Sequence, residues 1–171
     1  YRIRGAVDVP FSDKVKGRFT AFYGNYDGNI HNRATGDRVN GYEHWGVRGV
    51  IVADPTDDLS LTFIADYRKS DDDCCAEVIG TLPTNLAAGA LPTPRADKSR
   101  DIRQDLVTAT KEESKGISLQ ADWSVAGQTL TYIGSYREYD NTEIRDGDWL
   151  AQAYVGLNQL HDIGPQTGET Q

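Results

Sequence analysis

The most concentrated group of reactive side chains in the sequence is a run of three aspartates and two cysteines at residues 71–75. Carboxylates at such close spacing could bind a hard cation such as Ca²⁺, which prefers oxygen ligands. The run lacks the spacing of an EF-hand loop, and no further oxygen donors stand beside it. Consecutive acidic residues at the end of a strand are more often the solvated entrance to a loop. We therefore predict no metal site.

Cys74 and Cys75 are the only cysteines, and their adjacency matches neither a zinc site nor a disulfide framework. In an oxidising compartment they would form a disulfide, either with each other or with partners outside this sequence. A catalytic thiol would need a positioned histidine. His31, His44 and His161 occur in separate segments, and no signature links them to the cysteines. We therefore predict no catalytic residue.

Enzyme and cofactor motifs are missing from the sequence. It contains no P-loop, dinucleotide fingerprint, HExxH or GxSxG pattern. The net charge of −8 argues against a nucleic-acid partner, because phosphate binding depends on clustered lysine and arginine. We expect a protein that is not an enzyme and has no cofactor-binding residues. Ligand-binding residues remain unknown at this stage.

Hydrophobic residues alternate with polar ones in six stretches, at residues 1–9, 15–23, 44–53, 59–68, 117–125 and 130–137. In the clearest stretch, 59–68, Leu61, Phe63 and Ala65 alternate with Thr62 and Asp66. This period of two predicts strands, and no long stretch has the period of an amphipathic helix. No run approaches the roughly 18 apolar residues of a transmembrane helix. The predicted fold is all-β.

The connections between these stretches alternate between short and long. Residues 10–14, 54–58 and 126–128 are short and rich in turn-forming residues, whereas 27–41, 70–115 and the tail from 140 onward are long and polar. In an antiparallel up-and-down meander, every second connection lies at the same end of the sheet. One end should therefore carry short turns and the other long loops, as in transmembrane β-barrels of the outer membrane. We expect the long connection 70–115 to be largely irregular.

Aromatic residues fall at particular positions in these strands. Tyr23, Trp45, Tyr67 and Tyr136 share the apolar side and sit near the long connections, while Trp123 has the same parity near a short turn. Such residues would form two interfacial girdles at the surfaces of a membrane. The alternative interpretation is that they are ordinary strand aromatics that fill a core.

Four arginines share the polar side of their strands, namely Arg18, Arg48, Arg68 and Arg137. In a closed barrel they would point into the lumen, where they could contact an anionic cargo or a plug domain. Lumen-facing charge is also the general property of large barrels, so this pattern does not by itself define a ligand site.

Three segments of the sequence resemble the barrel of TonB-dependent outer-membrane receptors: RGAVDVPFSDKVKGRFTAFYGNYDGNI, GVRGVIVADPTDDLSLTFIADYRKSDDDCC and SLQADWSVAGQTLTYIGSYREYD. The resemblance implies a barrel of about 22 strands around an N-terminal plug, in the bacterial cell outer membrane. It also implies active uptake of a scarce nutrient such as a siderophore. Residues 1–171 would supply about six strands of that barrel, without the plug domain and the remaining strands. The implied partners are outer-membrane lipid, the rest of the barrel and plug, and the TonB machinery.

Two other interpretations remain open. A secreted or surface-exposed all-β binding module, such as an adhesin-like sandwich, would bury one face of its strands against a second sheet. It would not explain why the connections sort by length or why aromatics gather at strand ends. A complete small porin-like barrel needs at least about 8 strands, more than the six predicted.

Overall fold

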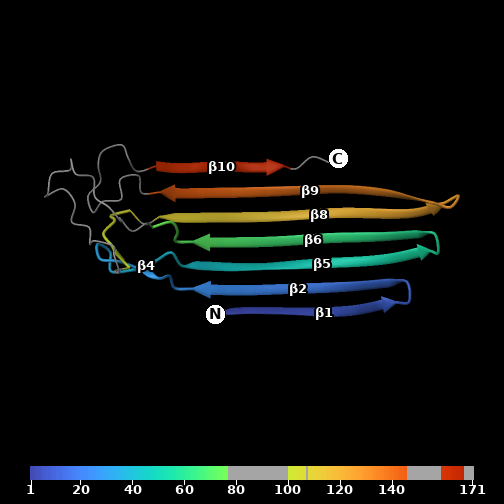
Figure 1. The fold of residues 1–171 in the computed structure, drawn as a ribbon, viewed down its shortest axis with the longest axis horizontal. Helices are drawn as coiled ribbons and strands as arrows, with labels where there is room; N and C mark the ends of the chain where they lie inside the picture. The colour runs from blue at the N-terminus through green and yellow to red at the C-terminus, as the bar shows by residue number, and fades with distance from the viewer. Residues whose placement is uncertain (77–99, 107, 146–158, 168–171) are drawn as a thin grey trace.

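The computed structural model describes residues 1–76, 100–106, 108–145 and 159–167, and its main feature is one antiparallel meander sheet (Figure 1). Each strand pairs with the next along the sheet, in the order β1-β2-β5-β6-β8-β9-β10. The predicted all-β meander is therefore confirmed. The strands are β1 (Arg2–Ser12), β2 (Val15–Tyr26), β5 (Tyr42–Thr56), β6 (Leu59–Asp72), β8 (Ala109–Val125), β9 (Gln128–Arg145) and β10 (Gln159–Thr167).

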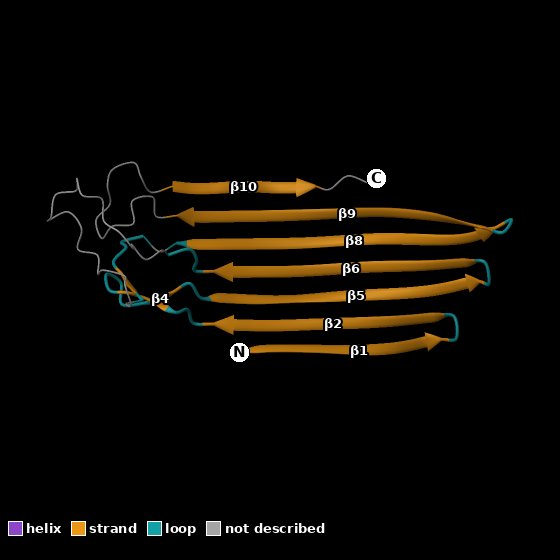
Figure 2. Ribbon diagram, viewed as in Figure 1, coloured by secondary structure: helices purple, strands orange, loops and turns teal. Residues whose placement is uncertain are grey.

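The three short connections lie together at one end of this sheet, as the sequence predicts. Figure 2 shows the turns β1–β2, β5–β6 and β8–β9 at the right-hand end of the view, opposite the longer connections. In each of these turns two residues join paired strand ends; in the β8–β9 turn, Ala126 and Gly127 join Val125 to Gln128. No helix in the described part of the chain is long and apolar enough to cross a membrane.

The predicted strand limits are too short at the end that carries the long connections. β6 continues to Asp72 and β8 begins at Ala109, so the connection between them is shorter than the predicted 70–115. The tail expected from residue 140 onward instead contains the end of β9 and the whole of β10. Backbone pairing extends the ladder here, although alternation of apolar residues has ended. Part of the expected irregular connection, residues 77–99 and 107, lies outside the described residues.

The long connections also contain three short strands that the sequence pattern does not reveal. β3 (Ile30–Asn32), β4 (Arg38–Val39) and β7 (Asp101–Ile102) form a second, three-stranded sheet in the order β4-β3-β7, with β3 and β7 parallel. We call the described parts of the two connections, residues 27–41, 73–76, 100–106 and 108, the loop cap. Alternation in the sequence does not reveal these strands, because strands of two or three residues are too short to produce a visible period.

The loop cap holds all the buried hydrophobic side chains among the described residues, namely Ile30, Val39, Ala76 and Ile102. Strands β1, β2, β5, β6, β8 and β9 of the large sheet contribute none. Within the described residues, the large sheet is therefore a single layer, and no second sheet packs on either face. This arrangement departs from a sandwich, in which two inner faces share one core.

Two asparagine side chains join the two connections. Asn40 Nδ2 donates to the Ala76 carbonyl at 2.8 Å, and the Ala76 amide donates to Asn40 Oδ1 at 2.7 Å. Asn32 Nδ2 donates to the Gln104 carbonyl at 2.8 Å, and the Gln104 amide donates to Asn32 Oδ1 at 3.2 Å. Each asparagine side chain thus donates to the carbonyl and accepts from the amide of one residue in the other connection. These bonds give partners to backbone groups in the interior of the loop cap.

The β8–β9 turn gives a test of local strain. Ala126 has φ 52° and Gly127 has φ 75°, the left-handed pair that a two-residue type I′ hairpin requires. Alanine is unfavourable there and asparagine is preferred. We expect Ala126→Asn to raise the free energy of unfolding by up to about 1 kcal/mol, and Gly127→Ala to lower it. Urea unfolding of the protein measures both changes, and Asp57→Asn in the β5–β6 turn is the control. A destabilising Ala126→Asn would contradict the assigned turn.

Candidate functional site: the two faces of the sheet

The register of the sheet gathers apolar side chains on one face. Residues directly opposite each other in adjacent strands lie on the same face. One such row crosses the sheet from β1 to β9 through Val7, Phe19, Gly49, Ala65, Ile117 and Tyr136. Among the large hydrophobic residues that the structure describes as exposed, only Tyr26 and Ile133 lie on the opposite side. We call the side that carries the row from Val7 to Tyr136 the apolar face. It is open to the surroundings, since Leu130 and Tyr132 are each 60% exposed.

Aromatic rings meet on the apolar face toward the loop cap. The rings of Trp45 and Tyr67 lie 5.1 Å apart between centroids, and those of Tyr1 and Tyr23 lie 5.9 Å apart. Tyr136 lies one row further from the loop cap than Tyr67. The predicted placement of these aromatics on one side and toward one end of the strands is confirmed, and their role at a membrane interface stays a prediction.

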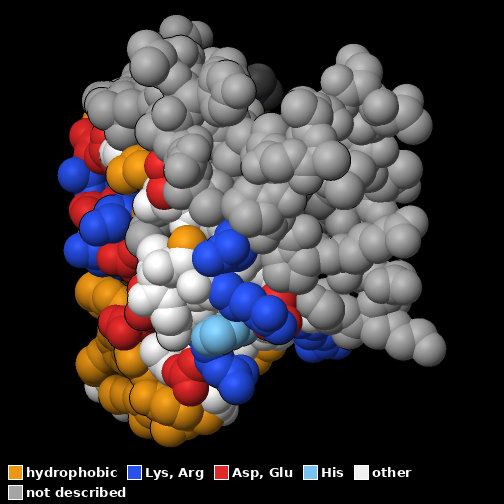
Figure 3. All heavy atoms as spheres, turned by 90° about the vertical axis from the view of Figure 1, so that its left-hand side faces the viewer, with side chains coloured by type: hydrophobic (Ala, Val, Ile, Leu, Met, Phe, Trp, Pro, Cys, Tyr) orange, Lys and Arg blue, Asp and Glu red, His pale blue; other side chains and the backbone are white. Residues whose placement is uncertain are grey.

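Charged residues stand on this face beside the aromatic rings and nearer the loop cap. Lys115 pairs with Glu138 at 2.5 Å, and Lys111 pairs with Asp71 at 3.7 Å. Figure 3 looks along the strands from this end and shows hydrophobic side chains at the lower left and charged side chains of both signs at the upper left. At the other end, Trp123 is 49% exposed beside the β8–β9 turn. The apolar face is thus a band with an aromatic or charged border at each end.

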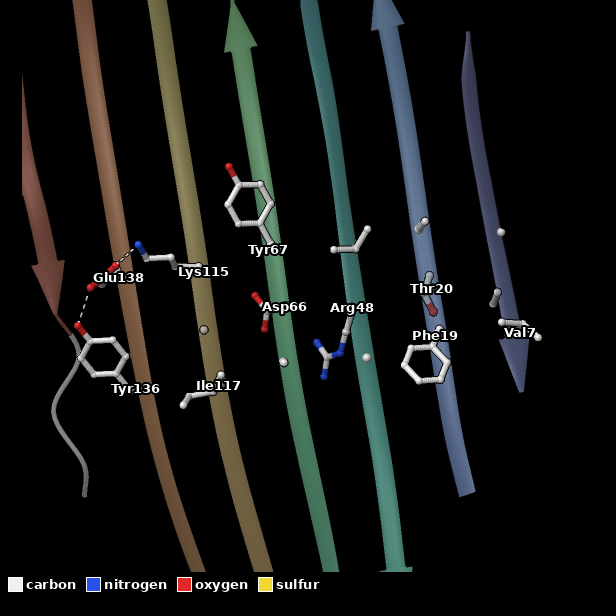
Figure 4. Close-up of a pocket in the computed structure, with 17 residues that line it drawn as sticks. Val7, Phe19, Thr20, Arg48, Asp66, Tyr67, Lys115, Ile117, Tyr136 and Glu138 are labelled. Atoms are coloured by element: carbon white, nitrogen blue, oxygen red, sulfur yellow. Dashed lines mark hydrogen bonds and ion pairs between the residues drawn. The ribbon is translucent and has the colours of Figure 1, made fainter. Parts of the chain in front are cut away.

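A shallow hollow of about 930 Å³ lies in the middle of the apolar face (Figure 4). Its floor is formed by the small residues Gly5, Ala21, Gly49 and Ala65 and by intervening backbone, and larger side chains stand around it. These include Phe19, Tyr67, Ile117 and Tyr136, which Figure 4 labels. The Tyr136 hydroxyl donates to Glu138 Oε1 at 2.7 Å, at the edge of the hollow next to Lys115. Such a surface accommodates hydrocarbon and offers few groups to a polar ligand.

The opposite side, which we call the polar face, carries the four predicted arginines. Arg137 Nη2 donates to Asp66 Oδ1 at 2.8 Å, and Arg137 Nη1 donates to Ser114 Oγ at 2.8 Å. To reach Asp66 from β9, this side chain crosses β8 at Gly116, where an added Cβ would stand 2.8 Å from Nη2. Arg18 Nη1 donates to Asp8 Oδ1 of the neighbouring strand at 3.1 Å.

Arg48 and Arg68 occupy adjacent positions on the polar face. Arg48 stands in register with Asp66, and Arg68 stands in register with Ser114. Neither guanidinium has a carboxylate within 4.0 Å in the described part of the chain. The strand register places all four arginines on the same side of the sheet, which confirms the prediction. Together they leave positive charge in the centre of the polar face, where one carboxylate, Asp66, is already bound to Arg137.

One polar cluster on this face was not identified from the sequence. His44 Nε2 lies 2.5 Å from Asp72 Oδ1, and Ser70 Oγ donates to the same oxygen at 3.1 Å. The His44 ring stacks on Tyr42 at 4.4 Å between centroids. Because the serine and the histidine both bind the carboxylate, the histidine is not placed to take a proton from the serine. The cluster therefore lacks the geometry of a catalytic triad.

The run at residues 71–75 does not converge on one point. Asp71 pairs with Lys111, Asp72 binds His44, and Asp73 lies in the loop cap. Cys74 and Cys75 form a disulfide with each other, which decides between the two pairings left open by the sequence. Successive residues of a strand point to opposite faces, so adjacent carboxylates separate. Among the described residues, no group of three potential ligands could hold a metal ion.

The remaining histidines lie apart from this run. His31 is in the loop cap, where Nδ1 lies 3.6 Å from Asp101 Oδ1. His161 belongs to β10, where it stands opposite Glu143 in the register with β9.

Comparison with known proteins identified no relative of this chain. A scan against protein-family models gave no match, and neither did searches of curated proteins and of solved structures.

The crossing of Arg137 over Gly116 predicts a specific coupling. Gly116→Ala should push the guanidinium away from Asp66 at little cost to the backbone, because the atoms that must move end a flexible side chain. We expect Asp66→Asn to destabilise the native protein by about 0.2–1 kcal/mol, and by less in the Gly116→Ala background. Urea unfolding of the four proteins in a double-mutant cycle measures this coupling. Equal effects of Asp66→Asn in both backgrounds would contradict the proposed contact.

The position of Asp73 predicts a dependence of the loop cap on pH. Burial raises the pKa of Asp73, and the backbone amide of Gly41 acts in the opposite direction. A carboxyl whose pKa is raised by folding favours the folded form when protonated, so its contribution is lost as pH rises through the folded-state pKa. Asp73→Asn should therefore slow hydrogen exchange at the Asn40 and Ala76 amides near pH 7, and the difference from wild type should shrink toward pH 4. Asp37→Asn, at an exposed position of the cap, is the control.

Proposed function

We propose that residues 1–171 form part of the wall of a large outer-membrane β-barrel, in a TonB-dependent receptor that takes up a scarce nutrient such as a siderophore. The observation that carries this proposal is the exposed apolar face, which is bordered by aromatic or charged side chains and backed by a polar face. Monomeric soluble proteins rarely expose a continuous apolar surface of this kind, whereas lipid covers it in a transmembrane barrel.

The length of the apolar band supports a membrane-spanning role. On β8 it runs from Ile117 to Val125, which matches the roughly 9–11 residues of a spanning strand. The same strand begins at Ala109, so its first part, with Lys111 and Lys115, extends beyond the band. In the proposed orientation this part projects on the side of the long connections, as the extracellular ends of outer-membrane barrels do.

The edges of the sheet support a partial wall rather than a complete small barrel. β1 and β10 are the two edge strands, and the described sheet does not close on itself. A strand edge in a membrane must be paired, because lipid offers no partners to backbone N–H and C=O groups. In the proposed receptor, further strands of the same barrel satisfy these two edges. The polar face then lines the lumen, where Arg48 and Arg68 would meet the plug or an anionic cargo.

The assignment to TonB-dependent receptors, and to uptake of a siderophore or a similar nutrient, is supported by the sequence resemblance. The second candidate is a secreted or surface-exposed all-β binding module of the adhesin type. That function requires a covering layer over the apolar face, and the described residues provide none. The two candidates differ in what surrounds Leu119: lipid in the barrel, and other side chains in a sandwich.

Spin labels at two neighbouring positions of β8 distinguish these candidates. Leu119 lies on the apolar face and Gln120 on the polar face. In the intact parent protein, folded into phospholipid vesicles, a nitroxide at Leu119→Cys should be accessible to oxygen dissolved in lipid. One at Gln120→Cys should be accessible to a water-soluble nickel reagent instead. Cys74 and Cys75 are bonded to each other and do not compete for the label while oxidised.

Substitution at the same positions provides the energetic control. Arginine near the middle of the lipid face costs about 2–4 kcal/mol. Leu119→Arg should therefore make folding into vesicles less favourable by that amount. Gln120→Arg should change it little, because charge on the lumen side stays hydrated. A label at Leu119 that neither reagent reaches, in a protein that is soluble without detergent, would reject the barrel and favour the sandwich.

A further inference from the structure

The outward side of the loop cap presents a group of arginines. In β3, Ile30 and Asn32 are buried while His31 and the following Arg33 are exposed. The same alternation buries Val39 and Ile102 and exposes Arg38 and Arg103. We call the exposed side chains of His31, Arg33, Arg38 and Arg103 the arginine patch. Figure 3 shows Lys or Arg side chains beside a histidine at this end of the molecule.

The register of the small sheet places these residues side by side. His31 stands opposite Arg38 of β4 and opposite Asp101 of β7. Asp101 binds Arg33 through Oδ2 and lies 3.6 Å from His31 Nδ1 through Oδ1. Arg33 and His31 nevertheless remain 54% and 51% exposed. Arg38 and Arg103 have no carboxylate within 4.0 Å in the described part of the chain.

The backbone beneath the arginine patch is fixed by hydrogen bonds. The His31 amide donates to the Arg100 carbonyl at 2.7 Å, and the Arg33 amide donates to the Ile102 carbonyl at 2.8 Å. The buried Asn32 side chain adds the two bonds to Gln104 described above. Cationic side chains from two connections that are far apart in sequence are therefore held over one ordered base. Less conformational entropy is lost on binding when a site is ordered in advance.

Guanidinium chemistry defines the class of ligand that fits. Arginine presents planar pairs of N–H donors that match carboxylate and phosphate oxygens, and it is always charged. A patch with three arginines on a small sheet can bind several oxyanion groups of one molecule at once. The exposed Asp37 and Asp105 beside it, together with the net charge of −8, disfavour a long polyanion such as a nucleic acid.

We propose that the arginine patch binds a small polyanion with two or more carboxylate or phosphate groups. Arg33, Arg38 and Arg103 donate to its oxygens, and Asp101 orients Arg33 and His31. This inference rests on the proposed function for the location of the patch and for the role of its ligand, and the binding itself is argued from the patch. In a receptor of that kind the long connections face the exterior, so the anion is a dissolved nutrient or chelate, and it binds before transport.

Calorimetric titration of the intact parent protein in detergent micelles tests the proposal, with citrate and pyrophosphate as separate probes. At least one probe should bind saturably. Arg33→Gln, Arg38→Gln and Arg103→Gln should each weaken it by about tenfold, since each removes charge-assisted hydrogen bonds to the anion. The matched control is Arg18→Gln, which removes one exposed arginine of the large sheet and should change affinity less than twofold. Preference for one probe distinguishes carboxylate from phosphate ligands.

The proposal is overturned if neither probe binds, or if Arg18→Gln weakens binding as much as the patch variants do. Hydrogen exchange at the His31 and Arg33 amides verifies that each variant keeps the loop cap folded. Tighter binding of a single-stranded oligonucleotide than of both small probes would also overturn it. Failure here is separate from failure of the proposed function: the spin labels report membrane insertion without any ligand. Arginine-dependent binding by a protein that does not insert would support this inference and reject the barrel.

Discussion

The backbone hydrogen-bond ladder is the constraint on which the rest of this structure depends. The sheet has no covering layer among the described residues, so burial of side chains does not hold its strands together. Each strand instead satisfies its N–H and C=O groups through both neighbours, and only β1 and β10 carry an open edge. A bilayer imposes the same requirement, because it offers no hydrogen-bond partners to a spanning strand. A sheet of one layer meets this requirement in a bilayer once its two edge strands are also paired.

Register follows from this ladder and determines the chemistry of both faces. A slip of one residue would move every side chain to the opposite face. The observed pairing keeps Phe63 and Leu119 together on the apolar face and brings Asp66 next to Gly116 on the polar face. The glycine then lets Arg137 reach Asp66 across the intervening strand. One alignment of strands therefore creates both an apolar surface and a set of charged contacts.

The loop cap follows a different principle from the large sheet. Its two connections are joined by a small buried cluster and by the side-chain amides of Asn32 and Asn40. The amide of Asn32 binds the Gln104 backbone through both its nitrogen and its oxygen, and this pairing favours one arrangement of the two connections. Within the described residues, the buried hydrophobic contacts are thus concentrated in the loop cap. The arginine patch depends on that order.

The sequence by itself determined the features that depend on neighbouring residues. The period of two predicted six strands and their faces, and the turn residues predicted which connections are short. It did not predict β10, the full length of β6 and β8, or the loop cap, because these depend on pairing with distant segments. The same holds for the site: the shared side of the four arginines was predictable from parity. The bonds from Arg137 to Asp66 and from His44 to Asp72 were not, since only the tertiary register decides which side chains from distant strands become neighbours.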